Sequence, residues 1–187
     1  MTQEREPRVE ELDPALIRAA AAGDLAAFER VVRAYQQHVW RFLRRLLGDP
    51  AAAEDVAQET FLRVYRGLPR FAHQAKFSTW VFQIARNAGL DELRRRRRRD
   101  RLAAAVRAPA AVGPVGEARA EIEAALADLP LDLREALVLV EVFGLPYADV
   151  SEVVGAPLGT VKSRVFRARE RLQAWAGAED GEAVGDV

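Results

Sequence analysis

Apolar residues recur every three or four positions along most of this chain, which is the spacing typical of amphipathic helices. Asp13-Pro14 has the form of a helix start, with an N-cap followed by proline at the first helical position. Asp24 can cap a second helix, in which one apolar stripe extends over residues 28–47. No run of alternating β-branched residues bounded by turns occurs, so the pattern predicts an all-α fold.

Two more helices are expected in the first half of the chain. Gly48-Asp49-Pro50 ends one helix and begins the next, which Leu68-Pro69 ends in turn. A loop of mixed chemistry follows at 70–77, and Ser78 or Thr79 is expected to cap a fourth helix. That helix continues into a run of arginines, and its expected inward positions are Val81, Ile84, Ala85 and Ala88.

The composition changes between residues 102 and 118, where Ala, Pro and Gly dominate, and this segment is predicted to be a flexible linker. Four further helices are expected after it, at about 119–128, 131–143, 146–154 and 158–175. The chain therefore divides into two small helical domains on a tether. The expected segments are an acidic arm at 1–11, a helical domain at 12–101, the linker at 102–118, a second domain at 119–176 and an acidic tail at 177–187.

The last two predicted helices have the form of a helix-turn-helix over about residues 147–172, with Gly155 in the tight turn. On a helical wheel, the apolar residues of the second helix group on one buried face: Val161, Val165, Ala168 and Leu172. The predicted DNA-contacting set lies opposite or beside this face: Lys162, Ser163, Arg164, Phe166 and Arg167. An outward phenylalanine can meet a thymine methyl group, and basic side chains can reach guanine edges or phosphates. The alternative is an ordinary bundle in which Phe166 is buried against a neighbour.

The net charge is zero, with 28 basic and 28 acidic residues, yet basic residues cluster in two places. The local net charge is +5 over residues 86–101 and +4 over residues 158–172. In the first cluster, four polar residues spaced by four, three and four positions form one ridge of a helix: Asn87, Asp91, Arg94 and Arg98. Such a ridge suits nucleic acid, because Asn pairs with base edges and Arg with phosphates. A solvated basic helix end is the alternative.

Several classes of function are excluded or disfavoured. The chain has no cysteine, which excludes disulfides, thiolate metal sites and cysteine nucleophiles. Its two histidines are far apart, so no metal, cofactor or catalytic site is predicted. Neither a signal peptide nor an apolar run long enough to cross a membrane occurs, which predicts a cytoplasmic protein without membrane insertion.

The sequence resembles the extracytoplasmic-function (ECF) sigma factors of bacterial RNA polymerase. Each matching piece is modest, but their order and spacing over about 150 positions are specific. The matching pieces are Asp24–Phe28, Ala53–Leu62, Phe77–Val81, Ile84–Asn87, Leu129-Pro130, Tyr147, Gly159–Arg164 and Arg167–Arg169. The resemblance implies two domains, region 2 at 12–101 and region 4 at 119–176. It also implies that the chain makes and breaks no covalent bond.

The resemblance also implies roles for the candidate residues. The surface that docks on the β′ clamp helices of core RNA polymerase would carry Asp55, Gln58, Glu59 and Phe61. The ridge of Asn87, Asp91, Arg94 and Arg98 would read the promoter −10 element, and loop 70–77 would capture a flipped −10 base. The outward face of the helix-turn-helix would read the −35 element of promoter DNA. The β flap of polymerase and a cognate anti-sigma factor are the further implied partners.

The main hypothesis is therefore an ECF-type sigma factor that directs core polymerase to specific promoters and supports promoter melting and transcription initiation. A stand-alone helix-turn-helix regulator is the alternative, but it leaves the first domain without a task. A helical adaptor that binds only protein is a third hypothesis, and it predicts no salt-sensitive affinity for DNA.

Overall fold

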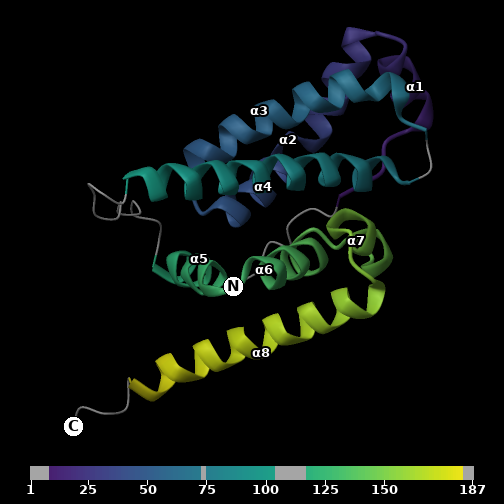
Figure 1. Cartoon of the computed structure of the whole chain (residues 1–187). Coiled ribbons are helices and arrows are strands. Elements are labelled where there is room, and N and C mark those ends of the chain that lie inside the picture. Colours follow the sequence, from purple (N-terminus) through teal and green to yellow (C-terminus); the bar gives the residue numbers. More distant parts are fainter. Residues whose placement is uncertain (1–8, 73–74, 104–116, 183–187) are drawn as a thin grey trace.

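The computed structural model describes residues 9–72, 75–103 and 117–182, and all regular secondary structure in these residues is helical, which confirms the predicted all-α class. The first module consists of four α-helices and one 3₁₀ turn (Figure 1). Their bounds are α1 Pro14–Ala21, α2 Leu25–Leu47, α3 Pro50–Gly67, η1 Leu68–Arg70 and α4 Phe77–Ala103. Their apolar faces enclose one core, in which Val31, Val39 and Val81 are fully buried.

Aspartate side chains begin the first three helices. Asp13, Asp24 and Asp49 each accept a hydrogen bond from a backbone N–H in the first turn, at 2.7, 3.0 and 2.9 Å. Such bonds satisfy donors that have no partner within the helix. Gly48 ends α2 in the left-handed conformation, with φ of 69°. These starts and this stop confirm the sequence prediction at the same residues.

The start of α4 differs from the expected one. The helix begins at Phe77, so neither Ser78 nor Thr79 is its N-cap, and the predicted cap is wrong. Instead the Ser78 backbone N–H and hydroxyl both donate to the carboxylate of Glu11, the former at 3.3 Å. Residues 9–12 thus pack on the first module, because the buried Tyr35 hydroxyl also donates to the Glu10 carbonyl at 2.9 Å. Burial raises the pKa of Tyr35.

The second module begins with α5 at Glu117–Asp128 and α6 at Leu131–Leu137. A π-helical turn, η2 at Val138–Val142, occupies the end of the helix expected at 131–143, and α7 (Tyr147–Val154) and α8 (Leu158–Glu182) follow. Because α8 continues to Glu182, the expected end of this helix at about 175 is wrong. At the expected linker, α4 extends to Ala103 and α5 begins at Glu117, and residues 104–116 lie outside the described part of the chain.

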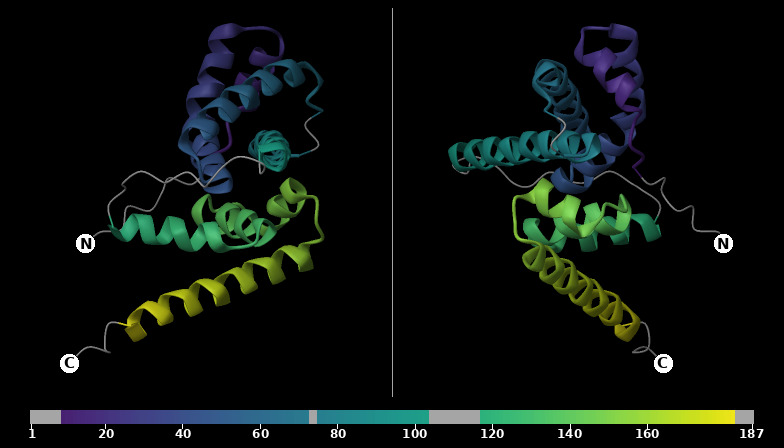
Figure 2. Two further views of the ribbon diagram at one scale, coloured as in Figure 1. Left: turned by 60° about the vertical axis from the view of Figure 1, so that its left-hand side comes forward. Right: turned by 90° about the vertical axis from the view of Figure 1, so that its right-hand side faces the viewer.

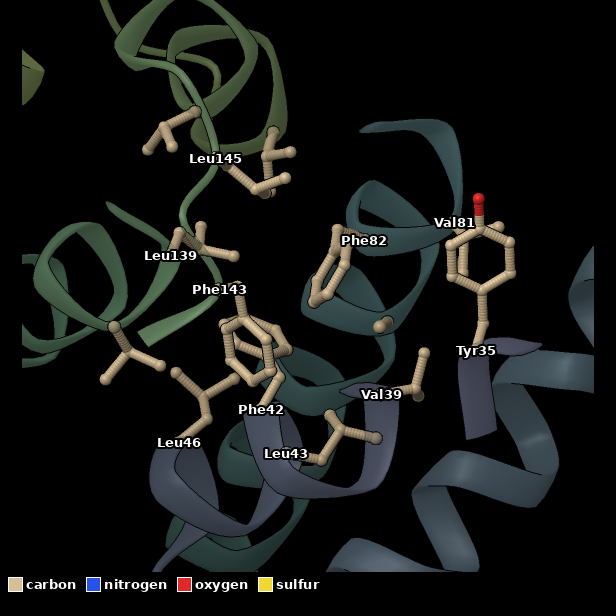
Figure 3. Close-up of a cluster of buried hydrophobic side chains, with 14 of the residues drawn as sticks. Tyr35, Val39, Phe42, Leu43, Leu46, Val81, Phe82, Leu139, Phe143 and Leu145 are labelled. Carbon is tan, nitrogen blue, oxygen red and sulfur yellow. The ribbon is translucent and has the colours of Figure 1, made fainter. Parts of the chain in front are cut away.

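The two modules pack against each other, which the sequence did not predict. The second module lies against α4 and the C-terminal end of α2, and α8 lies farthest from the first module (Figures 1 and 2). Phe143 sits between Phe42 of α2 and Phe82 of α4, with ring centroids 6.3 and 5.3 Å away (Figure 3). One apolar core therefore runs through both modules.

Candidate nucleic-acid interface

Helices α7 and α8 form the predicted helix-turn-helix. Gly155 follows α7 with φ of 64°, a left-handed conformation that a glycine adopts without strain. The Ser151 hydroxyl donates to the Ala156 carbonyl at 2.6 Å, which closes the turn from within. Val150, Val153 and Val154 are buried on the inner side of α7, so this helix packs on the core.

The faces of α8 lie as the helical wheel predicts. Val161, Val165 and Ala168 have no exposed surface. Phe166 is 60% exposed, so the interpretation in which it packs on a neighbour is wrong. The exposed candidates around it are Lys162, Ser163 and Arg167. Together with Phe166 they form a face that we name the α8 reading face.

Arg164 is the exception among the five candidates on α8. Its side chain is only 23% exposed and turns toward α6. Nε lies 3.3 Å from Asp132 Oδ2, and Nη1 lies 3.9 Å from Glu135 Oε1. In this arrangement Arg164 fixes α8 on α6 and does not belong to the α8 reading face.

The four candidates on α4 lie on one side of the helix, as their spacing predicts. Asn87, Arg94 and Arg98 are exposed, and they form with Asp91 what we name the α4 ridge. Asp91 is held by two arginines, because Arg63 donates to one carboxylate oxygen at 3.3 Å and Arg94 to the other at 3.0 Å. The ridge is therefore an ordered polar surface of net positive charge.

The basic end of α4 is also anchored to the first module. Arg96 donates to Asp49 at 2.8 Å and to Glu92 at 3.1 Å. The pKa of Asp49 is lowered, chiefly by the hydrogen bond from the Ala52 backbone N–H and further by Arg96. Arg96 thus serves the fold, and the six consecutive arginines are not equivalent on the surface.

An apolar groove lies between α2 and α3 of the first module. Its cavity volume is about 940 Å³, and twelve side chains line it: Leu25, Phe28, Val32, Gln36, Gln37, Trp40, Glu54, Ala57, Gln58, Phe61, Leu62 and Tyr65. Two predicted docking residues, Gln58 and Phe61, are among them. Asp55 is exposed outside the lining, and Glu59 forms an ion pair with Arg63 at 2.9 Å.

We name this feature the docking groove, and the sequence analysis missed most of its lining residues. Leu25, Leu62 and Tyr65 are 67%, 50% and 43% exposed, an unusual state for large apolar side chains. The available signal was their position outside the inward stripe of α2 and α3. An apolar face of this kind suits a helical partner.

Comparison with known proteins decides the family. The pattern described as Sigma-70 region 2 matches residues 31–99, and that described as Sigma-70, region 4 matches residues 119–172. The chain is 41% identical over 171 residues to the "Probable RNA polymerase sigma-C factor" of Mycobacterium bovis, which covers 89% of this chain and 92% of the relative. It belongs to the ECF RNA polymerase sigma factors. Such a factor directs RNA polymerase to promoters in transcription initiation.

Other relatives of this sigma factor agree in length and fold. The RNA polymerase sigma-H factor of Pseudomonas aeruginosa is 35% identical over 179 residues, covering 87% of this chain and 93% of the relative. The sigma factor RpoE of Bartonella quintana, solved with the anti-sigma factor NepR, superposes with a TM-score of 0.72 at 28% identity, covering 80% and 96% of the two chains. CnrH, solved with the cytosolic domain of CnrY, has a TM-score of 0.71 at 27% identity, covering 88% and 96%.

Polar contacts join region 2 and region 4 of this sigma factor, and none of them was predicted. Arg86 on α4 donates to both carboxylate oxygens of Glu135 at 2.7 and 2.9 Å, and Glu135 is only 2% exposed. At the edge of this contact, Lys76 donates to Asp149 at 2.7 Å, which raises the pKa of Lys76. A charged residue between Leu133 and Leu137 was the one signal available for Glu135.

The described residues of the sigma factor contain no group of three or more side chains placed to hold a metal ion. Within the same residues, no helix combines the length and apolarity needed to cross a membrane.

Proposed function

We propose that this sigma factor contacts promoter DNA through the α4 ridge and the α8 reading face, and core polymerase through the docking groove. The proposal assigns the −35 element to Lys162, Ser163, Phe166 and Arg167. It assigns the −10 element to Asn87, Asp91, Arg94 and Arg98. The chain then acts as a dissociable specificity subunit in the cytoplasm, and not as an enzyme.

The exposure of Leu25, Leu62 and Tyr65 in the docking groove carries the proposal. Burial of one such side chain is worth about 1.5–3 kcal/mol, so three exposed in one groove favour a partner that covers them. By the likeness to sigma factors, the proposed occupant of this groove is the pair of clamp helices of the polymerase β′ subunit. A stand-alone regulator gives this groove no occupant.

The two basic faces differ in the DNA that they suit. The α8 reading face belongs to a helix-turn-helix, whose second helix fits the major groove of duplex DNA. The α4 ridge is proposed to hold the opened −10 strand, and its helix begins at the aromatic cluster of Phe71, Phe77 and Trp80, with ring centroids 4.9–5.7 Å apart. Phe77 is buried in this cluster, whereas Phe71 and Trp80 are partly exposed.

Two further partners belong to the proposal. The solved relatives RpoE and CnrH are each bound to a second protein, NepR and CnrY, and NepR is named as an anti-sigma factor. By this likeness we propose a cognate anti-sigma factor for this chain. Region 4 is proposed to contact the β flap of polymerase as well.

A transcription assay tests the proposal. The full-length chain is added to core polymerase that lacks any sigma factor, with a pool of genomic promoter fragments as template. We expect specific transcripts whose start sites share −10 and −35 elements. No initiation from any fragment, together with tight binding of the chain alone to a palindrome, would instead show a stand-alone regulator.

A further inference from the structure

Arg63 connects two helices to which the proposed function gives different tasks. It lies on α3, which lines the docking groove, and its guanidinium reaches the α4 ridge. Nε donates to a Glu59 carboxylate oxygen at 2.9 Å, and Nη1 donates to Asp91 Oδ2 at 3.3 Å. These carboxylates raise the pKa of Arg63, with the Glu59 hydrogen bond as the largest cause. Arg63 is thus a cation fixed between two acids.

Asp91 is the acidic member of the α4 ridge. Its Oδ2 accepts from Arg63, and its Oδ1 accepts from Arg94 at 3.0 Å. A bare carboxylate on a surface that faces DNA would repel phosphates. Each carboxylate oxygen of Asp91 is paired with an arginine instead, so Asp91 is neutralised at this point of the ridge.

The two arginines are held to different degrees. The Arg94 side chain is 73% exposed, whereas that of Arg63 is 34% exposed and is bonded at both ends. Arg94 can therefore turn toward a phosphate at little cost, while Arg63 keeps its hold on Oδ2. The released Oδ1 then becomes a hydrogen-bond acceptor in a fixed place. A carboxylate in such a place accepts from the exocyclic amino group of a base, as in contacts to cytosine N4.

We infer that Arg63 is a positioning residue for −10 reading, which holds Asp91 so that one carboxylate oxygen faces the strand as an acceptor for a base amino group. The inference rests on the proposed function and deepens it. It gives a role in base choice to a residue on the helix that lines the docking groove, outside the α4 ridge itself. Asp91 becomes the residue that determines specificity at one −10 position.

The test uses Arg63→Met in the full-length chain, assembled with core polymerase. Methionine keeps much of the apolar stem and removes both hydrogen bonds. The template is a promoter library randomised across the −10 element with the −35 element held constant. We expect the preference at one −10 position to fall by about tenfold, the size of one good base contact. Asp91→Asn should flatten the same position, and the double variant should lose no more.

Arg66→Met is the matched control, since Arg66 is an exposed arginine on the same helix, without an ion pair to any described residue. It should keep the wild-type preference. The melting temperature and the affinity for core polymerase are measured for every variant. Equal loss of initiation from all library members in Arg63→Met would show a role in folding or assembly and overturn the inference. Flattening at a position that Asp91→Asn leaves sharp would overturn it too.

The same assay separates this inference from the proposed function. A wild-type chain that supports no initiation with core polymerase would remove the proposed function. A wild-type chain that initiates with a sharp −10 preference, left intact by Arg63→Met, would remove only the role of Arg63.

Discussion

A phenylalanine that is 60% exposed in the middle of a well-packed helix loses the free energy that burial would bring. Phe166 has this position, and its neighbours Lys162, Ser163 and Arg167 are exposed with it. The helical periodicity alone predicted this face, because the rotation per residue about the axis of one helix decides which side chains point outward. The inward turn of Arg164 could not be predicted in the same way, since it depends on Asp132 and Glu135 of another helix.

At the scale of single residues, we expect Arg167→Ala to weaken −35 recognition. Loss of a side chain that reads a base edge costs about 1–3 kcal/mol of binding free energy and relaxes the preference at that position. Competition between −35 variants for the assembled polymerase measures the effect. Arg169→Ala is the control, because Arg169 pairs with Glu141 on another side of α8. Unchanged promoter choice in Arg167→Ala would remove this residue from the α8 reading face.

Asp49 serves two purposes, and two substitutions separate them. It caps α3 through Ala51 and Ala52 and pairs with Arg96. Asp49→Ala should lower the free energy of unfolding by about 0.5–2 kcal/mol, whereas Asp49→Asn retains the cap and should lose less. Chemical denaturation at neutral pH measures both. Equal losses for the two variants would contradict a main role in capping.

The pH dependence of that contribution follows from the pKa of Asp49. Its folded-state pKa lies below the ordinary value of 3.8, so the carboxylate stabilises the fold above that value. The contribution is lost as the pH falls below about 4 and through the lowered pKa. The difference in stability between wild type and Asp49→Ala should therefore shrink in acid. A difference that stays constant down to pH 2 would contradict this.

Among the elements, helix starts were more predictable than helix ends. Asp13, Asp24 and Asp49 carry local signals for a start, and all three cap helices. The cap of α4 was not predictable, because Glu11 supplies it from 67 residues away. The end of α8 was placed too early, since acidic residues and a glycine favour a tail but do not forbid a helix. Helix boundaries could thus be predicted from neighbouring residues, except where a residue distant in the sequence supplies the cap.

The docking groove depends on two elements, and its apolar surface gives a direct prediction. Leu62→Ser should weaken binding to core polymerase at least severalfold, because an exposed apolar contact is lost at the interface. Its effect on folding should be small, since Leu62 is 50% exposed. Ile122→Ser is the control, as Ile122 is 62% exposed on α5, outside the groove. Equal binding of the two variants in a titration with labelled polymerase would contradict the docking assignment.

In the whole molecule, the contact between the modules is the feature that the sequence did not reveal. Phe42, Phe82 and Phe143 come from three distant segments, and Arg86 and Glu135 are 49 residues apart. Each of these residues has an ordinary local pattern, so only the assembled fold shows that they meet. Helical periodicity predicted two helical domains and their exposed faces, but it carries no information on which faces of the two domains pack together.

The continuous core predicts that the two modules unfold together. In the wild type, native-state hydrogen exchange should give similar free energies of opening for the slowest amides of α2–α4 and of α6–α8.

Phe143→Ala should lower the free energy of unfolding by about 3–5 kcal/mol, because Phe143 is 1% exposed. It should also split the protection of the two modules and enlarge the hydrodynamic radius, since the ring joins α2, α4 and the second module. Val31→Ala is the control, because Val31 is buried in the N-terminal half of α2 whereas Phe42 lies toward the other end of that helix, and its loss should lower both free energies without separating them. Equal protection of the two modules in Phe143→Ala would mean that the polar contacts around Arg86 and Glu135 are enough to hold them together.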